Sequence, residues 1–229
     1  MQSSNTLAKQ AIPSWDLTAL NETFARATPE TIVRWAVAQG VQTLTSTSFG
    51  PHAAATLHLV QHLAPGSLVV WVDSGFVDES TRNFARDLSQ QLGLEAAIFR
   101  PKTTPLACLA QLGIKDLNEV NTAQRRHLAD TIKLEPFQRA LDLFSPQIWI
   151  SGIRGEETAF RSELDVASWD ERGILKLAPF LRASSSDMEN YLSRHGLPLG
   201  PPVFDPTKAA QHLECGLHTR ANLNRPQAH

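Results

Sequence analysis

The segment Glu214-Cys215-Gly216-Leu217-His218 carries one of only two cysteines in the chain. His212 and His218 lie three residues on either side of Cys215, and a Pro/Gly-rich stretch at 196–202 precedes the segment. The thiolate is the nucleophilic form of cysteine, and cationic neighbours favour it. A buried structural cysteine is the usual alternative, but the polar, proline-marked surroundings weigh against it. We therefore predict that Cys215 is a reactive thiol carried on an exposed tail.

Polar residues follow three predicted strands, at the point where each strand ends. The three clusters are Ser46–Gly50, Asp73–Phe76 and Gly152–Arg161. In an open parallel sheet, ligands bind at the carboxyl ends of the strands. We therefore expect the three clusters to converge on one site.

The first cluster suits an anion. Ser46, Ser48 and Gly50 supply hydroxyls and backbone N–H groups just before a predicted helix, and this combination binds phosphate or sulfate. An ordinary capped turn is the alternative. In the second cluster, Asp73 precedes Gly75 at the end of the most hydrophobic strand. An acid in this place hydrogen-bonds a ribose or base, or caps the next helix.

The third cluster contains Arg154 and Arg161, with Glu156-Glu157 between them. Arginine forks match the oxygens of sulfate and phosphate. A solvated, salt-bridged loop is the alternative. The sequence therefore predicts an anion site with two guanidinium groups at this strand end.

Other candidates favour structural roles. Cys108 lies in an apolar segment that predicts a buried helix position. His58 and His62 have the spacing of helical metal ligands, but no Glu completes a zinc-protease pattern. An amphipathic helix with two incidental histidines is the better interpretation, and we predict no metal site.

Strand and helix signals alternate along the chain, which predicts an α/β fold with a parallel sheet flanked by helices. The predicted strands are Val41–Thr45, Ser67–Val72, Glu95–Phe99, Pro146–Ser151 and the weaker Ile174–Leu177. The predicted helices cover 28–40, 52–63, 78–92, 102–145 with a break at 133–136, and 186–195. The last helix is expected to begin with a capping box formed by Ser186 and Glu189.

Composition limits the class of protein. The chain has 229 residues and 42% hydrophobic content, enough for one core. Its 21 basic and 23 acidic residues give a net charge of -2, so no basic excess suggests nucleic-acid binding. Met1 to Trp15 lacks a signal-peptide core, and no run is long enough to span a membrane. With two cysteines, we expect a cytoplasmic protein and no four-cysteine iron–sulfur cluster.

The motifs together resemble the phosphoadenylyl-sulfate (PAPS) reductase family, the thioredoxin-dependent sulfonucleotide reductases without an iron–sulfur cluster. The resemblance runs from about residue 41 to 218, and the cysteine segment is its most specific part. The interval before that segment, Phe204 to Leu213, is shorter than the family usually has. The matching pieces are 46–50, 73–76, Ile132-Lys133-Leu134-Glu135-Pro136, 152–157 with Arg161, and 214–218.

The resemblance implies an adenine-nucleotide α-hydrolase-like fold. Residues 1–200 would form the nucleotide-binding domain, and residues 201–229 a flexible tail that carries the cysteine. Cys215 would be the nucleophile that forms an S-sulfocysteine, and reduced thioredoxin or glutaredoxin would then release sulfite. The family often forms homodimers. The implied substrate-binding residues are Ser46, Ser48, Gly50, Asp73, Gly75, Lys133, Arg154, Arg161 and His218.

Two other functions stay open at this point. One is an adenine-nucleotide-binding relative that performs ATP-dependent adenylation, although the usual pyrophosphate loop is absent. The other is a non-catalytic regulatory protein that binds nucleotide.

Overall fold

The computed structural model describes residues 14–207, so Cys215 and His218 lie outside the described part of the chain. A six-stranded sheet with the order β3-β2-β1-β4-β6-β5 forms its centre. All pairings in this sheet are parallel except that of β5 with β6, which is antiparallel at the edge. The predicted mostly parallel α/β fold is therefore confirmed. The strands are β1 (Thr43–Thr47), β2 (Leu68–Val72), β3 (Ala96–Phe99), β4 (Ile148–Ser151), β5 (Ala167–Trp169) and β6 (Leu175–Leu177).

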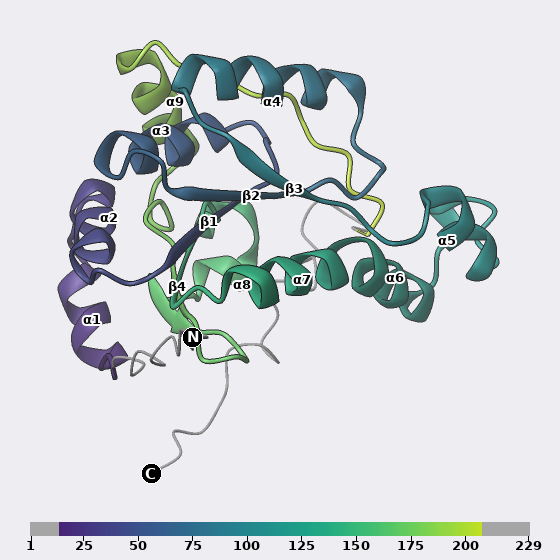
Figure 1. Ribbon diagram of the computed structural model, residues 1–229, viewed down its shortest axis with the longest axis horizontal. Coiled ribbons are helices and arrows are strands. Elements are labelled where there is room, and N and C mark those ends of the chain that lie inside the picture. Colours follow the sequence, from purple (N-terminus) through teal and green to yellow (C-terminus); the bar gives the residue numbers. More distant parts are fainter. Residues whose placement is uncertain (1–13, 208–229) are drawn as a thin grey trace, which may run out of the picture.

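Helices cover both faces of the sheet (Figure 1). On one face, α2, α3, α4 and α9 bury their apolar sides in the larger core, which includes Ile32, Leu57, Leu88 and Met188. On the other face, α7 covers β2 and β3 and packs Phe137 and Leu141 in a second core. The helices are α1 (Leu17–Phe24), α2 (Pro29–Ala38), α3 (Ala53–Leu63), α4 (Glu79–Leu92), α5 (Pro105–Gln111), α6 (Thr122–Ala129), α7 (Glu135–Phe144), α8 (Ala159–Ser162) and α9 (Ser185–Arg194).

Helix starts follow the predicted chemistry at two places and differ at a third. Thr28 caps α2 with Pro29 at its first turn, and the Asp78 carboxylate caps α4. At α9 the prediction was wrong by two residues, because Ser184 forms the N-cap and Asp187 completes the capping box. Three consecutive serines make the spacing ambiguous in sequence, and Ser184 is the serine whose partner lies at the third helical position.

The predicted break at 133–136 is also wrong. A π-helical turn, η2 (Asp130–Leu134), joins α6 to α7 without interruption. Pro136 lies in the first turn of α7, where its missing N–H matters little. A π-helical turn of this kind often marks a functional site, and it contains Lys133.

Two elements gave no signal strong enough to predict. Helix α1 begins at the Asp16 N-cap in a stretch that looks polar and unpatterned. Strand β5 is only three residues long, and it pairs antiparallel with β6 across the turn at 170–174. Both lie at the same edge of the fold, where the Asn21 amide exchanges hydrogen bonds with the backbone of Ala167.

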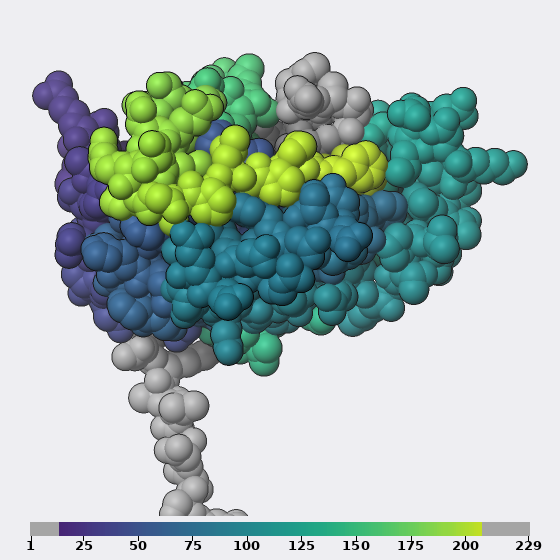
Figure 2. All heavy atoms as spheres, turned by 90° about the horizontal axis from the view of Figure 1, so that it is seen from above, coloured from purple at the N-terminus to yellow at the C-terminus, as the bar shows by residue number. Residues whose placement is uncertain are grey.

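After α9 the chain runs as an extended strap alongside α4 (Figure 2). The Gly200 N–H donates to the Pro51 carbonyl at 2.8 Å. A side chain at Gly200 would meet the Gly50 carbonyl oxygen at 2.5 Å, so this close crossing requires glycine. The strap, defined here as residues 196–207, therefore passes directly over the loop after β1. Whether residues 201–229 form a separate tail remains a prediction.

The described helices include none that is both long and apolar enough to cross a membrane.

Candidate active site

The loop after β1 is held in an unusual backbone conformation. Phe49 has a φ of 51°, although it is not glycine. Its N–H donates to the Thr47 hydroxyl at 3.0 Å, and its ring is fully buried edge-on against Trp71. Strained backbone of this kind is retained where surrounding packing enforces it, and it concentrates at functional loops. The packing of Phe49 thus fixes the path of the chain between Ser48, which is exposed, and Gly50.

Trp149 positions the first predicted site residue. Its Nε1 donates to Ser46 Oγ at 2.8 Å across the β1–β4 pair. Because indole is only a donor, the Ser46 hydroxyl accepts this bond and keeps its own proton for an acceptor elsewhere. The Trp149 side chain was not predicted as part of the site. No local sequence signal indicated it, because the contact depends on the register of β1 and β4, in which Trp149 lies opposite Leu44.

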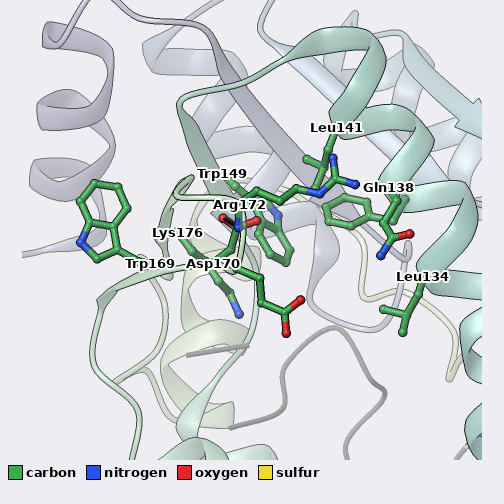
Figure 3. Close-up of a pocket in the computed structure, with 10 residues that line it drawn as sticks. Leu134, Gln138, Leu141, Trp149, Trp169, Asp170, Arg172 and Lys176 are labelled. Atoms are coloured by element: carbon green, nitrogen blue, oxygen red, sulfur yellow. Dashed lines mark hydrogen bonds between the residues drawn. The ribbon is translucent and has the colours of Figure 1, made fainter. Parts of the chain in front are cut away.

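Behind Trp149 lies a small cavity of about 60 Å³, on the sheet face that α7 covers only in part. Figure 3 shows Lys176, Asp170 and Arg172 around it. Lys176 Nζ lies 4.8 Å from the centre of the Trp149 ring, a cation–π contact that fixes the indole. Burial raises the pKa of Asp170, although two backbone N–H groups bond its carboxyl group.

The two predicted arginines lie at the end of β4, and both are buried. Arg154 contacts Glu156 at 3.2 Å and Glu157 at 3.9 Å, and Arg161 donates to Glu157 Oε2. The arginine side chains are 7% exposed, whereas Glu156 and Glu157 are 51% and 37% exposed. The carboxylates thus lie on the solvent side of the guanidinium groups. They neutralise the cations here and are accessible enough to be displaced by a ligand anion.

His52, at the start of α3, interacts electrostatically with the charges of this cluster. Burial and then the Arg154 charge lower the pKa of its imidazole, and Glu157 opposes the shift. Strand pairing aligns Ser46 with Ser151, three residues before Arg154. The structure therefore brings the first and third predicted clusters to the same sheet edge, at the point where the strand order reverses. Ligands bind at such reversal points in open α/β sheets.

The second predicted cluster is arranged differently. The Asp73 carboxylate is 3% exposed and lies 3.0 Å from Arg100 Nε and 3.7 Å from Arg82 Nη2. It also accepts the Gly75 N–H at 3.0 Å. Gly75 has a φ of 82°, and a side chain there would lie 2.5 Å from Pro105, so glycine is required. Both carboxylate oxygens therefore have partners inside the protein.

Lys133 lies in the π-helical turn η2, and its ammonium group donates to the Asp205 carboxylate of the strap. Burial would raise the pKa of Asp205, but Lys133 and the hydrogen bonds from Thr207 outweigh it and lower the pKa. Arg125 donates to the Pro206 carbonyl nearby. The strap thus ends against a lysine to which the family resemblance assigns a substrate-binding role. No sequence signal indicated Asp205 as its partner.

An open cavity of about 530 Å³ lies between the strap and the segment that joins α5 to α6. Its lining combines apolar and charged side chains of both signs: Leu109, Leu117, Phe204, Lys115, Arg125, Asp116 and Asp205. It therefore offers room for a bulky polar ligand on the Lys133 side of the site.

The structural interpretations of two other candidates fit their surroundings. Cys108 is 1% exposed on α5, and burial raises the pKa of its thiol. His58 donates to or accepts from Tyr191 at 3.0 Å and stacks on His62. Among residues 14–207, no group of three or more metal-ligating side chains has the arrangement of a metal site.

Solved structures share the fold of this chain. Phosphoadenylyl-sulfate (PAPS) reductase from Candida auris, in a phosphate complex, aligns with a TM-score of 0.69 at 19% identity, over 83% of this chain and 92% of that one. Candida glabrata FMN adenylyltransferase in complex with ATP aligns with a TM-score of 0.53 at 15% identity, over 84% and 61%. The fold is therefore of the adenine-nucleotide α-hydrolase-like class.

Sequence comparison gives the family. A model of the phosphoadenosine phosphosulfate reductase domain matches residues 42–204. A Synechococcus phosphoadenosine 5'-phosphosulfate reductase is 30% identical over 82% of this chain and 81% of its own. The corresponding Sodalis glossinidius protein is 33% identical over 81% and 75%. The chain belongs to the PAPS reductase family of enzymes, as the resemblance implied.

Proposed function

We propose that this enzyme reduces 3′-phosphoadenylyl sulfate to sulfite and adenosine 3′,5′-bisphosphate through an S-sulfocysteine on Cys215. The Cys215 thiolate attacks the sulfate sulfur, an S–S bond forms, and the bond from sulfur to the phosphate oxygen breaks. A thiolate of reduced thioredoxin or glutaredoxin then attacks Cys215 Sγ and releases sulfite. The second thiol of the donor closes its disulfide, so the dithiol supplies both electrons.

The paired arginines at the end of β4 are the observation that carries this proposal. An anionic nucleophile approaching a multiply charged substrate needs fixed positive charge at the reacting group. Arg154 and Arg161 are buried and held in place, and the more exposed Glu156 and Glu157 are among their ion-pair partners. We assign the sulfate and the neighbouring phosphate to these two guanidinium groups.

The loop after β1 would bind the 5′-phosphate. The Ser46 proton is free to donate because Trp149 uses the oxygen as an acceptor. Ser48 and the Gly50 backbone complete this anion site in the proposal, with Asp73 and Gly75 beside the nucleoside. His218 would accompany Cys215 when the tail reaches the site.

Lys133 gives the tail a means of responding to substrate. Its ammonium group is held by Asp205, ten residues before Cys215 in sequence. A substrate phosphate is a second anion for the same lysine, so it would compete with Asp205 and loosen this end of the strap. We propose that this exchange helps the tail move between the nucleotide and the donor protein.

The remaining assignments complete the proposal. The enzyme acts in the cytoplasm, as a homodimer or a monomer, with thioredoxin or glutaredoxin as its macromolecular partner and without a resident metal or cofactor. Reducing conditions there keep Cys215 available as a thiolate.

The test is a sulfite-release assay with PAPS and with adenylyl sulfate (APS), each with reduced thioredoxin. We expect sulfite from PAPS. Cys215→Ser should abolish release while still binding adenosine 3′,5′-bisphosphate. Cys108→Ala is the matched control, because Cys108 is buried on α5 and its thiol is not predicted to react. ATP consumption with pyrophosphate release in place of sulfite would instead identify an adenylating enzyme, and tight binding without turnover a regulatory one.

A further inference from the structure

Asp73 holds two arginines that the proposed reaction does not use. Its carboxylate is almost fully buried, with Arg100 Nε on one oxygen and Arg82 Nη2 beside the other. The arginine side chains are 64% and 47% exposed. The buried acid thus fixes one side of each guanidinium group and leaves the other side toward solvent. We call Arg82, Asp73 and Arg100 the arginine clamp.

The solvent side of the clamp is available to an anion. Within residues 14–207, the guanidinium groups of Arg82 and Arg100 have no hydrogen-bond acceptor or ion-pair partner other than Asp73. Two arginines and one aspartate leave a net charge of +1. Asp78, the N-cap of α4, interacts electrostatically with Arg82, and Glu79 lies in the first turn of the same helix.

Further cations gather on the Arg100 side. Arg139 donates to the Arg100 backbone carbonyl, and Lys102 and Arg139 share Glu135. Hydrogen bonding from Arg139 lowers the pKa of Glu135, so this acid stays charged and leaves one cation unbalanced. The end of β3 is therefore electropositive as a whole, and the two guanidinium groups with unused N–H groups are its most specific feature.

The clamp lies beside the proposed phosphosulfate site. Asp73 follows β2 and Arg100 follows β3, whereas Ser46 to Gly50 follow β1. The sheet order β3-β2-β1 puts these strand ends about 5 and about 10 Å away from that of β1. A ribose held between the two positions would present its 5′ substituent to β1 and its 3′ substituent to the clamp.

We propose that Arg82 and Arg100, oriented by Asp73, bind the 3′-phosphate of the nucleotide and thereby select PAPS over APS. This inference rests on the proposed function, because it takes the 5′-phosphosulfate as bound at β1 and β4. A doubly charged phosphate matches two guanidinium forks, and APS, with a hydroxyl at the same carbon, leaves the clamp unpaired. The clamp sets specificity, whereas Arg154 and Arg161 serve the reacting group.

The experiment measures binding and turnover on matched nucleotides. Dissociation constants for adenosine 3′,5′-bisphosphate and for AMP are measured by calorimetry on Cys215→Ser, and kcat/KM for PAPS and APS on the otherwise intact chain. Each is repeated with Arg100→Ala, Arg82→Ala, Arg100→Lys and the control Arg86→Ala. Arg86 lies on α4 one turn beyond Arg82, and in the described part of the chain it pairs only with its neighbours Asp87 and Asn83.

We expect Arg100→Ala and Arg82→Ala each to weaken the bisphosphate about 10- to 100-fold and to change AMP less than about threefold. The preference for PAPS over APS falls by the same factor. Arg100→Lys keeps the charge but loses the fork, so it gives an intermediate loss, and Arg86→Ala changes nothing.

Equal losses for both nucleotides in the arginine variants would overturn the clamp, because they indicate a purely structural pair. So would an unaltered preference, or a starting chain that does not distinguish the bisphosphate from AMP. A chain that binds the bisphosphate through the clamp but releases no sulfite would refute the proposed reaction and leave the clamp supported.

Discussion

Two pairs of arginines lie at the sheet edge, Arg154 with Arg161 and Arg82 with Arg100. They differ in whether the guanidinium groups or their carboxylate partners are buried. At the end of β4 the guanidinium groups are buried and the carboxylates face solvent. At the ends of β2 and β3 the carboxylate is buried and the guanidinium groups face solvent. An incoming anion has to displace the carboxylates at the end of β4. At the ends of β2 and β3 it meets guanidinium N–H groups that already face solvent.

This difference separates two tasks. Desolvated cations stabilise charge more strongly, which favours chemistry at β4. Exposed cations held by a buried acid recognise an anion without rearrangement, which favours specificity at β2 and β3. Burial, rather than the residue types alone, therefore distinguishes the catalytic from the selective side of the site.

The largest effect is expected at the buried pair. Arg161→Ala should lower kcat/KM about 100- to 1,000-fold for PAPS and for APS alike, because both carry the sulfate that it would neutralise. The measurement is steady-state sulfite release on both nucleotides. The control is Arg172→Ala. Arg172 lies in the β5–β6 turn and pairs with Asp142 of α7, so its removal should have no effect. A loss of activity confined to PAPS would show that Arg161 selects the nucleotide instead of acting on the sulfate.

Asp73→Asn should have the second-largest effect, mainly by lowering the stability of the folded protein. It removes the buried charge between Arg82 and Arg100 while keeping the shape, and the protein should lose about 2 to 4 kcal/mol of unfolding free energy. The PAPS preference should fall as the two arginines lose their orientation. Urea unfolding and the kcat/KM ratio test this prediction. A stable variant that keeps its preference would show that Asp73 does not orient the clamp.

Glu157→Gln should act in the opposite direction at the other pair. It removes the acid that Arg161 and Arg154 share, so a nucleotide no longer has to displace it. We expect adenosine 3′,5′-bisphosphate to bind a few-fold more tightly, because the partly exposed Glu157 carboxylate no longer competes with it for the two guanidinium groups. Calorimetry on the Cys215→Ser background measures this, with exposed Glu171→Gln as control. Weaker binding would mean that Glu157 itself supports the site.

The smallest effect concerns α3 and α9, away from both pairs. Burial, and then His195 and His62, lower the pKa of His58 from 6.5. The folded state therefore binds the His58 proton only at a lower pH than the unfolded state does. The contribution of neutral His58 to the free energy of unfolding is complete above about pH 7 and declines as the pH falls below 6.5. His58→Gln should flatten that decline by about 1 kcal/mol or less. Urea unfolding between pH 5 and 7.5 measures it, and an unchanged slope would exclude His58.

The sheet and the strand-end rule were predictable because local signals determine them. Buried apolar runs such as Leu68–Val72 predict parallel strands, and the polar clusters after them identify the site edge. Arg100 obeys the same rule after β3 and could have been found by it. The burial of the arginine side chains could not be predicted, because nothing in the sequence distinguishes the buried Arg154 from the exposed Arg82.

Long-range contacts set the remaining limits. The bond from Trp149 to Ser46 spans 103 residues, and that from Lys133 to Asp205 spans 72. Such pairs depend on how the strands register and where the strap crosses, which no local pattern encodes. The continuous helix through η2 was missed because the Glu135-Pro136 step predicts a break, and a π-helical turn joins the two helices there instead.

Cys215 is the residue on which the proposed reaction depends most, and one measurement tests its role directly. The chain is incubated with PAPS labelled with ³⁵S in the sulfate, without any reductant, and the labelled peptide is identified by mass spectrometry. We predict one label per chain on Cys215, released as sulfite when reduced thioredoxin is added, and none in Cys215→Ser. A chain that binds the nucleotide but carries no label on Cys215, while a known PAPS reductase is labelled alongside, would contradict it.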